Sequence, residues 1–160
     1  MIRNLEYKEK RKGYKRVIIS VYLGLMMLFY LGYILMDNYH LSKSEQWINT
    51  DYLTQGDIQN IQQLNFWTSM FENSFWGLII LATLLLLFRY RKNKKALIHF
   101  IILHLCLFTT LFLIGYILSF FLISPIGNLT EPLTFSALLP VIIVIYTAFV
   151  LINERLSKSI

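Results

Sequence analysis

The sequence has only one cysteine, three prolines and seven glycines among its 160 residues. A lone cysteine excludes an internal disulfide, a CxxC redox pair and a zinc site built from cysteines. Cys106 stands inside an uncharged run, so we interpret it as a small buried hydrophobic side chain. The cysteine content therefore gives no information about the redox compartment.

Patterns typical of catalysis are also missing. The sequence contains no H-E-x-x-H, no G-x-S-x-G, no phosphate-binding glycine loop and no pair of aspartates inside an apolar run. The seven glycines are scattered along the chain. We predict that the protein is not an enzyme and that it carries neither a cofactor nor a metal.

Lys, Arg, Asp and Glu are absent from four long stretches, residues 17–36, 75–88, 96–124 and 133–152. A helix needs about 20 apolar residues to cross the roughly 30 Å hydrocarbon core of a bilayer. The first stretch is too long for a signal peptide, and no small-residue cleavage site follows it. We therefore predict an all-α membrane protein, a single domain with four transmembrane helices over 17–36, 73–88, 96–124 and 133–152.

The charged residues predict the topology. Fourteen of the fifteen Lys and Arg residues, but three of the nine Asp and Glu residues, lie in the N-terminal 16 residues, in 89–95 and in 153–160. Positive segments stay in the cytoplasm, so we predict cytoplasmic N- and C-termini and a cytoplasmic turn at 89–95. Basic side chains near the surface also attract anionic lipid headgroups. The expected headgroup contacts are Arg11, Lys12, Lys15, Arg16, Arg89, Arg91, Lys92, Lys94 and Lys95.

The longest polar stretch, residues 37–72, is predicted to lie outside the cytoplasm. Thr54-Gln55-Gly56-Asp57 has the form of a helix N-terminus, and apolar residues recur after it at helical spacing. We predict an amphipathic helix over 55–71 that lies on the outer surface or caps the bundle, with continuation into the second span as the alternative. A short outer turn follows the third span at 125–132.

The acidic residues of the outer stretch are Asp37, Glu45, Asp51 and Asp57. Their spacing is not that of a calcium loop, and we interpret them as a solvated acidic surface, with attraction of a cationic peptide or metal as the alternative. Asn128 begins a glycosylation sequon. The composition favours a low-GC bacterium, where this sequon has no role.

Three ionisable side chains interrupt the apolar segments: Glu72, His99 and His104. Polar groups at this depth are candidate functional sites because burying them is costly, and His104 has the chemistry to titrate, bind a metal or relay protons. The alternative is a hydrogen bond to a neighbouring helix. His99 and His104 lie about 140° apart around a helix and do not face one ligand. Glu72 either marks the water boundary or binds a cation.

Small residues four apart let helices approach closely in lipid. Ser20 and Gly24, with Gly32 further along a similar face, and Gly115 with Ser119 form such pairs. We expect them to pack inside the bundle, with packing against a partner protein as the alternative.

These features favour a non-enzymatic accessory or binding protein of the bacterial plasma membrane, of the immunity, secretion or sensor-accessory type. Its partners would be anionic lipid, and a membrane protein, a peptide or a second copy of the chain, whereas nucleic acid is not needed to explain the positive charge. One alternative is an oligomeric, holin-like pore or small channel with Thr109, Thr110 and Ser119 as its polar stripe. The other is a redox or transport subunit that uses His104.

Overall fold

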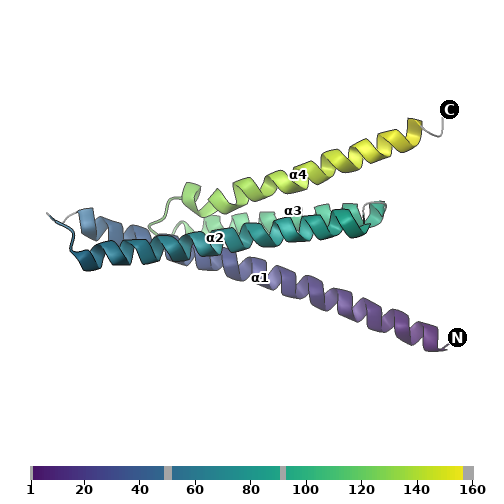
Figure 1. Cartoon of the computed structure of the whole chain (residues 1–160), viewed down its shortest axis with the longest axis horizontal. Coiled ribbons are helices and arrows are strands. Elements are labelled where there is room, and N and C mark those ends of the chain that lie inside the picture. The colour runs from purple at the N-terminus through teal and green to yellow at the C-terminus, as the bar shows by residue number, and fades with distance from the viewer. Residues whose placement is uncertain (1, 49–51, 91–92, 157–160) are drawn as a thin grey trace.

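The computed structural model describes residues 2–48, 52–90 and 93–156. These residues form helices and turns and no strand, which confirms the predicted all-α fold for this part of the chain. The helices are α1 (Ile2–Ile48), α2 (Gln55–Tyr90), α3 (Lys94–Leu118) and α4 (Ile126–Leu156) (Figure 1).

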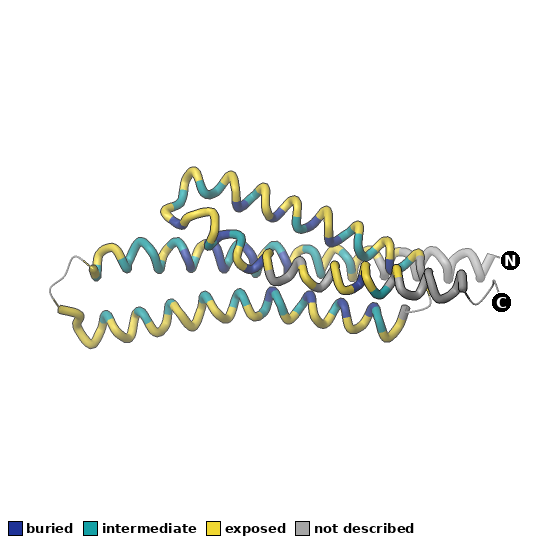
Figure 2. Tube along the Cα trace, turned by 90° about the horizontal axis from the view of Figure 1, so that it is seen from above, coloured by how far each residue is buried: buried dark blue, intermediate teal, exposed yellow. Residues whose placement is uncertain are grey.

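The helices run up and down along one long axis. α1 and α2 form an antiparallel hairpin that extends well past the turn between α3 and α4 (Figures 1 and 2). The start of α1, the end of α2, the start of α3 and the end of α4 lie toward the opposite end (Figure 1). We call these two ends the hairpin end and the termini end. The described parts of the three basic segments therefore lie toward the termini end.

Three helical stretches of the described chain are long and apolar enough to cross a membrane, Arg16–Ile48, Gln55–Arg89 and Lys95–Leu118. This supports the prediction of a membrane protein. The first two have 33 and 35 residues, and at 1.5 Å per residue each extends about 50 Å, well beyond the roughly 30 Å hydrocarbon core. The part of α1 and α2 that exceeds the thickness of the hydrocarbon core belongs to the hairpin. Many side chains of α4 are outside the described part, so a fourth span stays a prediction.

Helix boundaries at the hairpin end differ from the sequence-based expectation. α1 continues through residues 37–48, and α2 runs without a break from the expected amphipathic helix into the second span, which is the alternative given for that segment. α3 ends at Leu118 instead of residue 124, and α4 begins at Ile126 inside the expected outer turn. The turn therefore occupies residues 119–125.

Specific hydrogen bonds hold this shorter turn. The Asn38 side-chain oxygen accepts from the backbone N–H groups of Ile123, at 2.8 Å, and Ser124, at 3.4 Å. The Pro125 carbonyl accepts the first bonds of α4, from the N–H groups of Asn128 and Leu129. Proline is favourable at a helix start because its φ angle is already helical. Asn38, which is distant in sequence, thus helps to set where α3 stops.

The main core lies where all four helices meet. Its buried side chains include Met26, Tyr30, Ile34, Phe75, Ile79, Leu107, Leu111 and Leu129. The Tyr30 hydroxyl donates to the Leu129 carbonyl at 3.0 Å, and the Tyr33 hydroxyl donates to the Asn128 carbonyl at 3.0 Å. The Trp76 indole N–H donates to the Pro132 carbonyl at 3.2 Å. These bonds tie α1 and α2 to the first turns of α4.

Two glycines permit close helix contacts in this core. A Cβ atom on Gly32 would lie 2.6 Å from the Phe71 ring, and one on Gly115 would lie 2.5 Å from the Tyr30 hydroxyl. Gly24, by contrast, has no neighbouring atom within 4 Å of that position, and Ser20 is exposed. Ser119 is the C-cap of α3. The predicted packing residues therefore divide: Gly32 and Gly115 lie in helix contacts, whereas Ser20 and Gly24 face outward.

Cys106 is exposed, so the interpretation of a buried cysteine is wrong. It lies on α3, within the stretch that is apolar enough to span a membrane. In such a protein the core-facing and lipid-facing sides are equally apolar. Hydrophobicity alone therefore does not identify the buried face.

Candidate functional site

A compact cap closes the hairpin. The Thr54 hydroxyl accepts from the Asp57 backbone N–H at 3.2 Å, and the Asp57 carboxylate accepts from the Thr54 backbone N–H at 3.0 Å. This is the helix start that the sequence predicts. The same carboxylate accepts from the Trp47 indole at 3.2 Å, which joins the end of α1 to the start of α2.

Asp57 lies at the far tip of the hairpin, beyond the predicted span at 73–88. Hydrogen bonds from the hydroxyl and then the backbone N–H of Thr54 hold the pKa of Asp57 below its ordinary value. Hydrogen bonds to a carboxylate favour its charged form. The tip therefore carries a negative charge at neutral pH.

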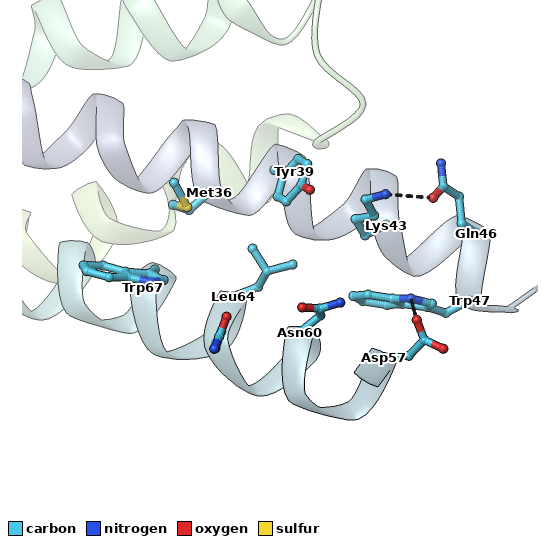
Figure 3. A pocket seen from close by; sticks show the side chains of 10 residues that line it. Met36, Tyr39, Lys43, Gln46, Trp47, Asp57, Asn60, Leu64 and Trp67 are labelled. Atoms are coloured by element: carbon cyan, nitrogen blue, oxygen red, sulfur yellow. Dashed lines mark hydrogen bonds between the residues drawn. The ribbon is translucent and has the colours of Figure 1, made fainter. Parts of the chain in front are cut away.

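A cleft of about 620 Å³ lies between the two arms of the hairpin (Figure 3). This volume is within the range of small-ligand and peptide side-chain pockets. We call it the hairpin cleft, and its lining includes Tyr39, Lys43, Trp47, Asp57, Asn60, Gln63 and Trp67. Tyr39 and Trp67 are 50% and 44% exposed, so large aromatic faces are accessible to a ligand. The surrounding amide and carboxylate groups supply hydrogen-bond acceptors and donors.

Three carboxylates, one each on α1, α2 and α4, are near enough to one another for their charges to interact. The charges that act on Glu72 come from Glu131 and Asp37, and all three carboxylates act on the Tyr33 hydroxyl. We call Asp37, Glu72 and Glu131 the acidic cluster. It brings together α1, α2 and α4, and the structure thus places Glu72 beside other acids.

Asp37 is only 8% exposed, and its Oδ2 atom has no hydrogen-bond partner. The interpretation of a solvated acidic surface is therefore wrong for Asp37, because α1 stays helical past residue 36 and this side chain is buried on it, one turn after Tyr33. Glu45 is exposed, and Asp51 lies outside the described residues. A buried carboxylate without a partner is costly, which makes Asp37 a candidate contact for a cation.

His104 is fully buried, and both of its ring nitrogens have partners. Nδ1 lies 2.9 Å from the Phe100 carbonyl, and Nε2 lies 2.7 Å from the Tyr22 hydroxyl. A carbonyl only accepts, so Nδ1 carries the proton and Nε2 accepts from Tyr22. This neutral pair links α3 to α1 and leaves no free ring nitrogen for a metal. His99, five residues earlier, is exposed.

Within the described residues, no three His, Cys, Asp or Glu side chains are arranged to hold a metal ion. The proposed polar stripe on α3 is also satisfied internally. Thr109 and Thr110 donate to the carbonyls of Leu105 and Cys106, each at 2.8 Å, and Ser119 donates to the Tyr116 carbonyl at 2.7 Å. Each of these three hydroxyl groups is therefore hydrogen-bonded to a backbone carbonyl of α3, so none of them needs a water-filled pore as its partner.

The predicted headgroup contacts that the structure describes lie on α1, α2 and α3 toward the termini end. Arg16, Arg89 and Lys95 are exposed. Arg91 and Lys92 fall outside the described residues, as do the side chains of Arg11, Lys12, Lys15 and Lys94.

The fold and these sites define an all-helical protein with apolar, membrane-length helices and a polar helical hairpin at one end. No family model matches the sequence, and no curated protein or solved structure gives a significant match. The functional argument therefore depends on the chain's own geometry.

Sequence reasoning missed Tyr22, Tyr33 and Asn38 as site residues. Tyr33 and Asp37 are four apart, and this spacing places two side chains on one helix face. The four-residue spacing of Tyr33 and Asp37 is visible in the sequence. Placing both residues on one helix face, however, requires the knowledge that α1 continues past residue 36. The Tyr22–His104 pair is 82 residues apart and has no local signal.

Proposed function

We propose that the protein is a non-enzymatic accessory protein of the bacterial plasma membrane that recognises a basic peptide segment at its hairpin end. The four helices would cross the bilayer with both termini in the cytoplasm, and the hairpin would project on the outer side. The observation that carries this proposal is the hairpin cleft, a pocket with exposed aromatic faces on a rigid helical projection that the short α3–α4 turn leaves uncovered.

Charge favours a basic ligand. Among residues 37–72 and 125–132 the sequence has six acids and a single cation, Lys43. Lys43 interacts with Gln46 at 3.2 Å and with the Tyr39 ring at 6.0 Å, so it is held on the α1 side of the cleft. Opposite charge accelerates encounter and selects partners. Exposed aromatic rings add cation–π and stacking contacts to Lys and Arg side chains.

Peptide binding would use two contact regions. Trp67 and Tyr39 would hold apolar or cationic side chains in the hairpin cleft, where aromatic anchors contribute most of the binding energy. The acidic cluster would then take a Lys or Arg side chain, whose ammonium or guanidinium would give Asp37 the partner that it lacks. Immunity toward a peptide toxin, and control of a secretion or sensor protein, both fit this mode of action.

Photo-cross-linking tests the proposal. Gln63 lines the hairpin cleft, whereas its neighbour Gln62 is exposed outside it, so a photoreactive amino acid at each position gives a matched pair. The probes are a fluorescent amphipathic peptide of Lys and Leu and its counterpart of Glu and Leu. We expect the Lys peptide to react at position 63, much less at 62, and the Glu peptide at neither.

Trp67→Ala should weaken binding of the Lys peptide by about 30-fold, because a buried aromatic anchor contributes roughly 2 kcal/mol. Met70→Ala, which removes an exposed side chain on the same helix outside the cleft lining, is the control and should have little effect. Equal reaction at positions 62 and 63, or undiminished binding by Trp67→Ala, would contradict the proposal. Leakage of liposomes caused by the purified protein would instead favour the pore-forming alternative.

A further inference from the structure

A second pocket, unrelated to the hairpin, lies in the termini half of the bundle. It is a crevice of about 380 Å³ between α1, α2 and α3. Its lining is apolar apart from Tyr22 and Arg89, and includes Ile19, Ala82, Leu85 and Phe100. Toward this end α1 diverges from α2 and α3 (Figure 1). We call this pocket the apolar crevice.

The apolar crevice has the length of one bilayer leaflet. Its lining on α2 extends from Leu78 to Arg89, which corresponds to about 16 Å along a helix. Half of the hydrocarbon core is about 15 Å. If α2 crosses the bilayer as predicted, the crevice begins near the midplane and ends at the cytoplasmic headgroups.

No polar group inside the crevice requires water. The Tyr22 hydroxyl is already bonded to His104, at 2.7 Å. The crevice opens sideways between Ile18, Leu81 and Leu85, which are 50%, 54% and 60% exposed. An empty apolar gap loses dispersion contacts. In a membrane, the chains that surround this opening are lipid acyl chains.

Arg89 is the one charged side chain among the described lining residues, and it lies at the termini end of the crevice. A guanidinium pairs with phosphate through two parallel hydrogen bonds. We propose that the apolar crevice binds an acyl chain of an anionic phospholipid from the cytoplasmic leaflet, with the lipid phosphate on Arg89. This inference concerns a different site from the peptide-binding proposal and does not depend on it.

Native mass spectrometry of protein extracted from bilayers of equal phosphatidylglycerol and phosphatidylcholine tests this site. We expect the wild type to retain one phosphatidylglycerol. Ala82→Trp fills the crevice and should lose this lipid, whereas Leu84→Trp, an exposed position on the same helix outside the lining, should keep it. Arg89→Gln should retain about fivefold less, since one basic side chain near the surface contributes about 1 kcal/mol. Lys43→Gln, which removes one cation at the hairpin end and outside the crevice lining, is its control and should retain the lipid.

Inorganic phosphate should not displace the lipid, because the acyl chain supplies much of the binding. If inorganic phosphate displaced the lipid, Arg89 would bind anions without a contribution from the acyl chain, and the proposal would be overturned. Equal retention by the wild type, Ala82→Trp and Arg89→Gln, or equal retention of both lipids, would overturn it as well. Arg89 is exposed and outside the core, so its variant decides the question even if Ala82→Trp does not fold.

Discussion

Gly115→Leu is expected to be the most destabilising single substitution in the main core. A Cβ atom at this position would lie 2.5 Å from the Tyr30 hydroxyl, so the leucine would displace the ring that donates to the Leu129 carbonyl. Overpacking costs about 1–3 kcal/mol, and an unsatisfied buried polar group costs about 1–3 kcal/mol more. We therefore expect the free energy of unfolding to fall by about 3 kcal/mol or more.

Reversible unfolding in mixed detergent micelles measures this effect. Gly24→Leu is the matched control, because Gly24 lies on α1 with no atom within 4 Å of the added carbon. Leucine favours a helix over glycine by roughly 0.5–1 kcal/mol, so the control should be neutral or slightly stabilising. If the two variants had the same free energy of unfolding, this result would contradict the close contact between α1 and α3 at Gly115.

Asp37→Asn is expected to stabilise the protein and to weaken binding of the basic peptide. The Asp37 Oδ2 atom has no hydrogen-bond partner, and the side chain is 8% exposed beside Glu72. A buried polar atom without a partner costs about 1–3 kcal/mol, so we expect the amide, which can donate to neighbouring carboxylates, to raise the free energy of unfolding by about 1–2 kcal/mol. The same substitution would remove the proposed contact for a Lys or Arg side chain.

Parallel unfolding and peptide-binding measurements test both halves of this prediction. Glu45→Gln is the control, because Glu45 is exposed and lies outside both the acidic cluster and the cleft lining, and an exposed charge contributes less than about 1 kcal/mol. Unchanged stability in Asp37→Asn would contradict the cost assigned to the Oδ2 atom without a hydrogen-bond partner. Unchanged binding with raised stability would remove Asp37 from the peptide site but leave the hairpin cleft in place.

The sequence was informative where a local rule applied. The all-helical fold followed from the uncharged stretches, and the Thr54–Asp57 cap followed from a short motif with a defined hydrogen-bond pattern. Residues 37–48 were missed as helix because their polar composition resembles a loop. They stay helical in contact with α2, and this contact is not visible in local composition.

Long-range contacts account for the remaining differences. α3 ends at Leu118, and the turn that follows is bonded to Asn38, more than 80 residues earlier. The burial of Asp37 depends on the continuation of α1, and the His104 geometry depends on Tyr22. For the turn after α3 and for His104 the deciding partner lies on another helix, and sequence periodicity carries no information about it.

The placement of the two ends on opposite sides of a bilayer is the central claim, and labelling with a membrane-impermeant thiol reagent tests it most directly. In a Cys106→Ser background, Gln59→Cys reports on the hairpin and Lys94→Cys on the connection between α2 and α3. In intact right-side-out vesicles we expect Gln59→Cys to react at once and Lys94→Cys to react only after permeabilisation. Reaction of both positions before permeabilisation would place the two ends on the same side and contradict the account.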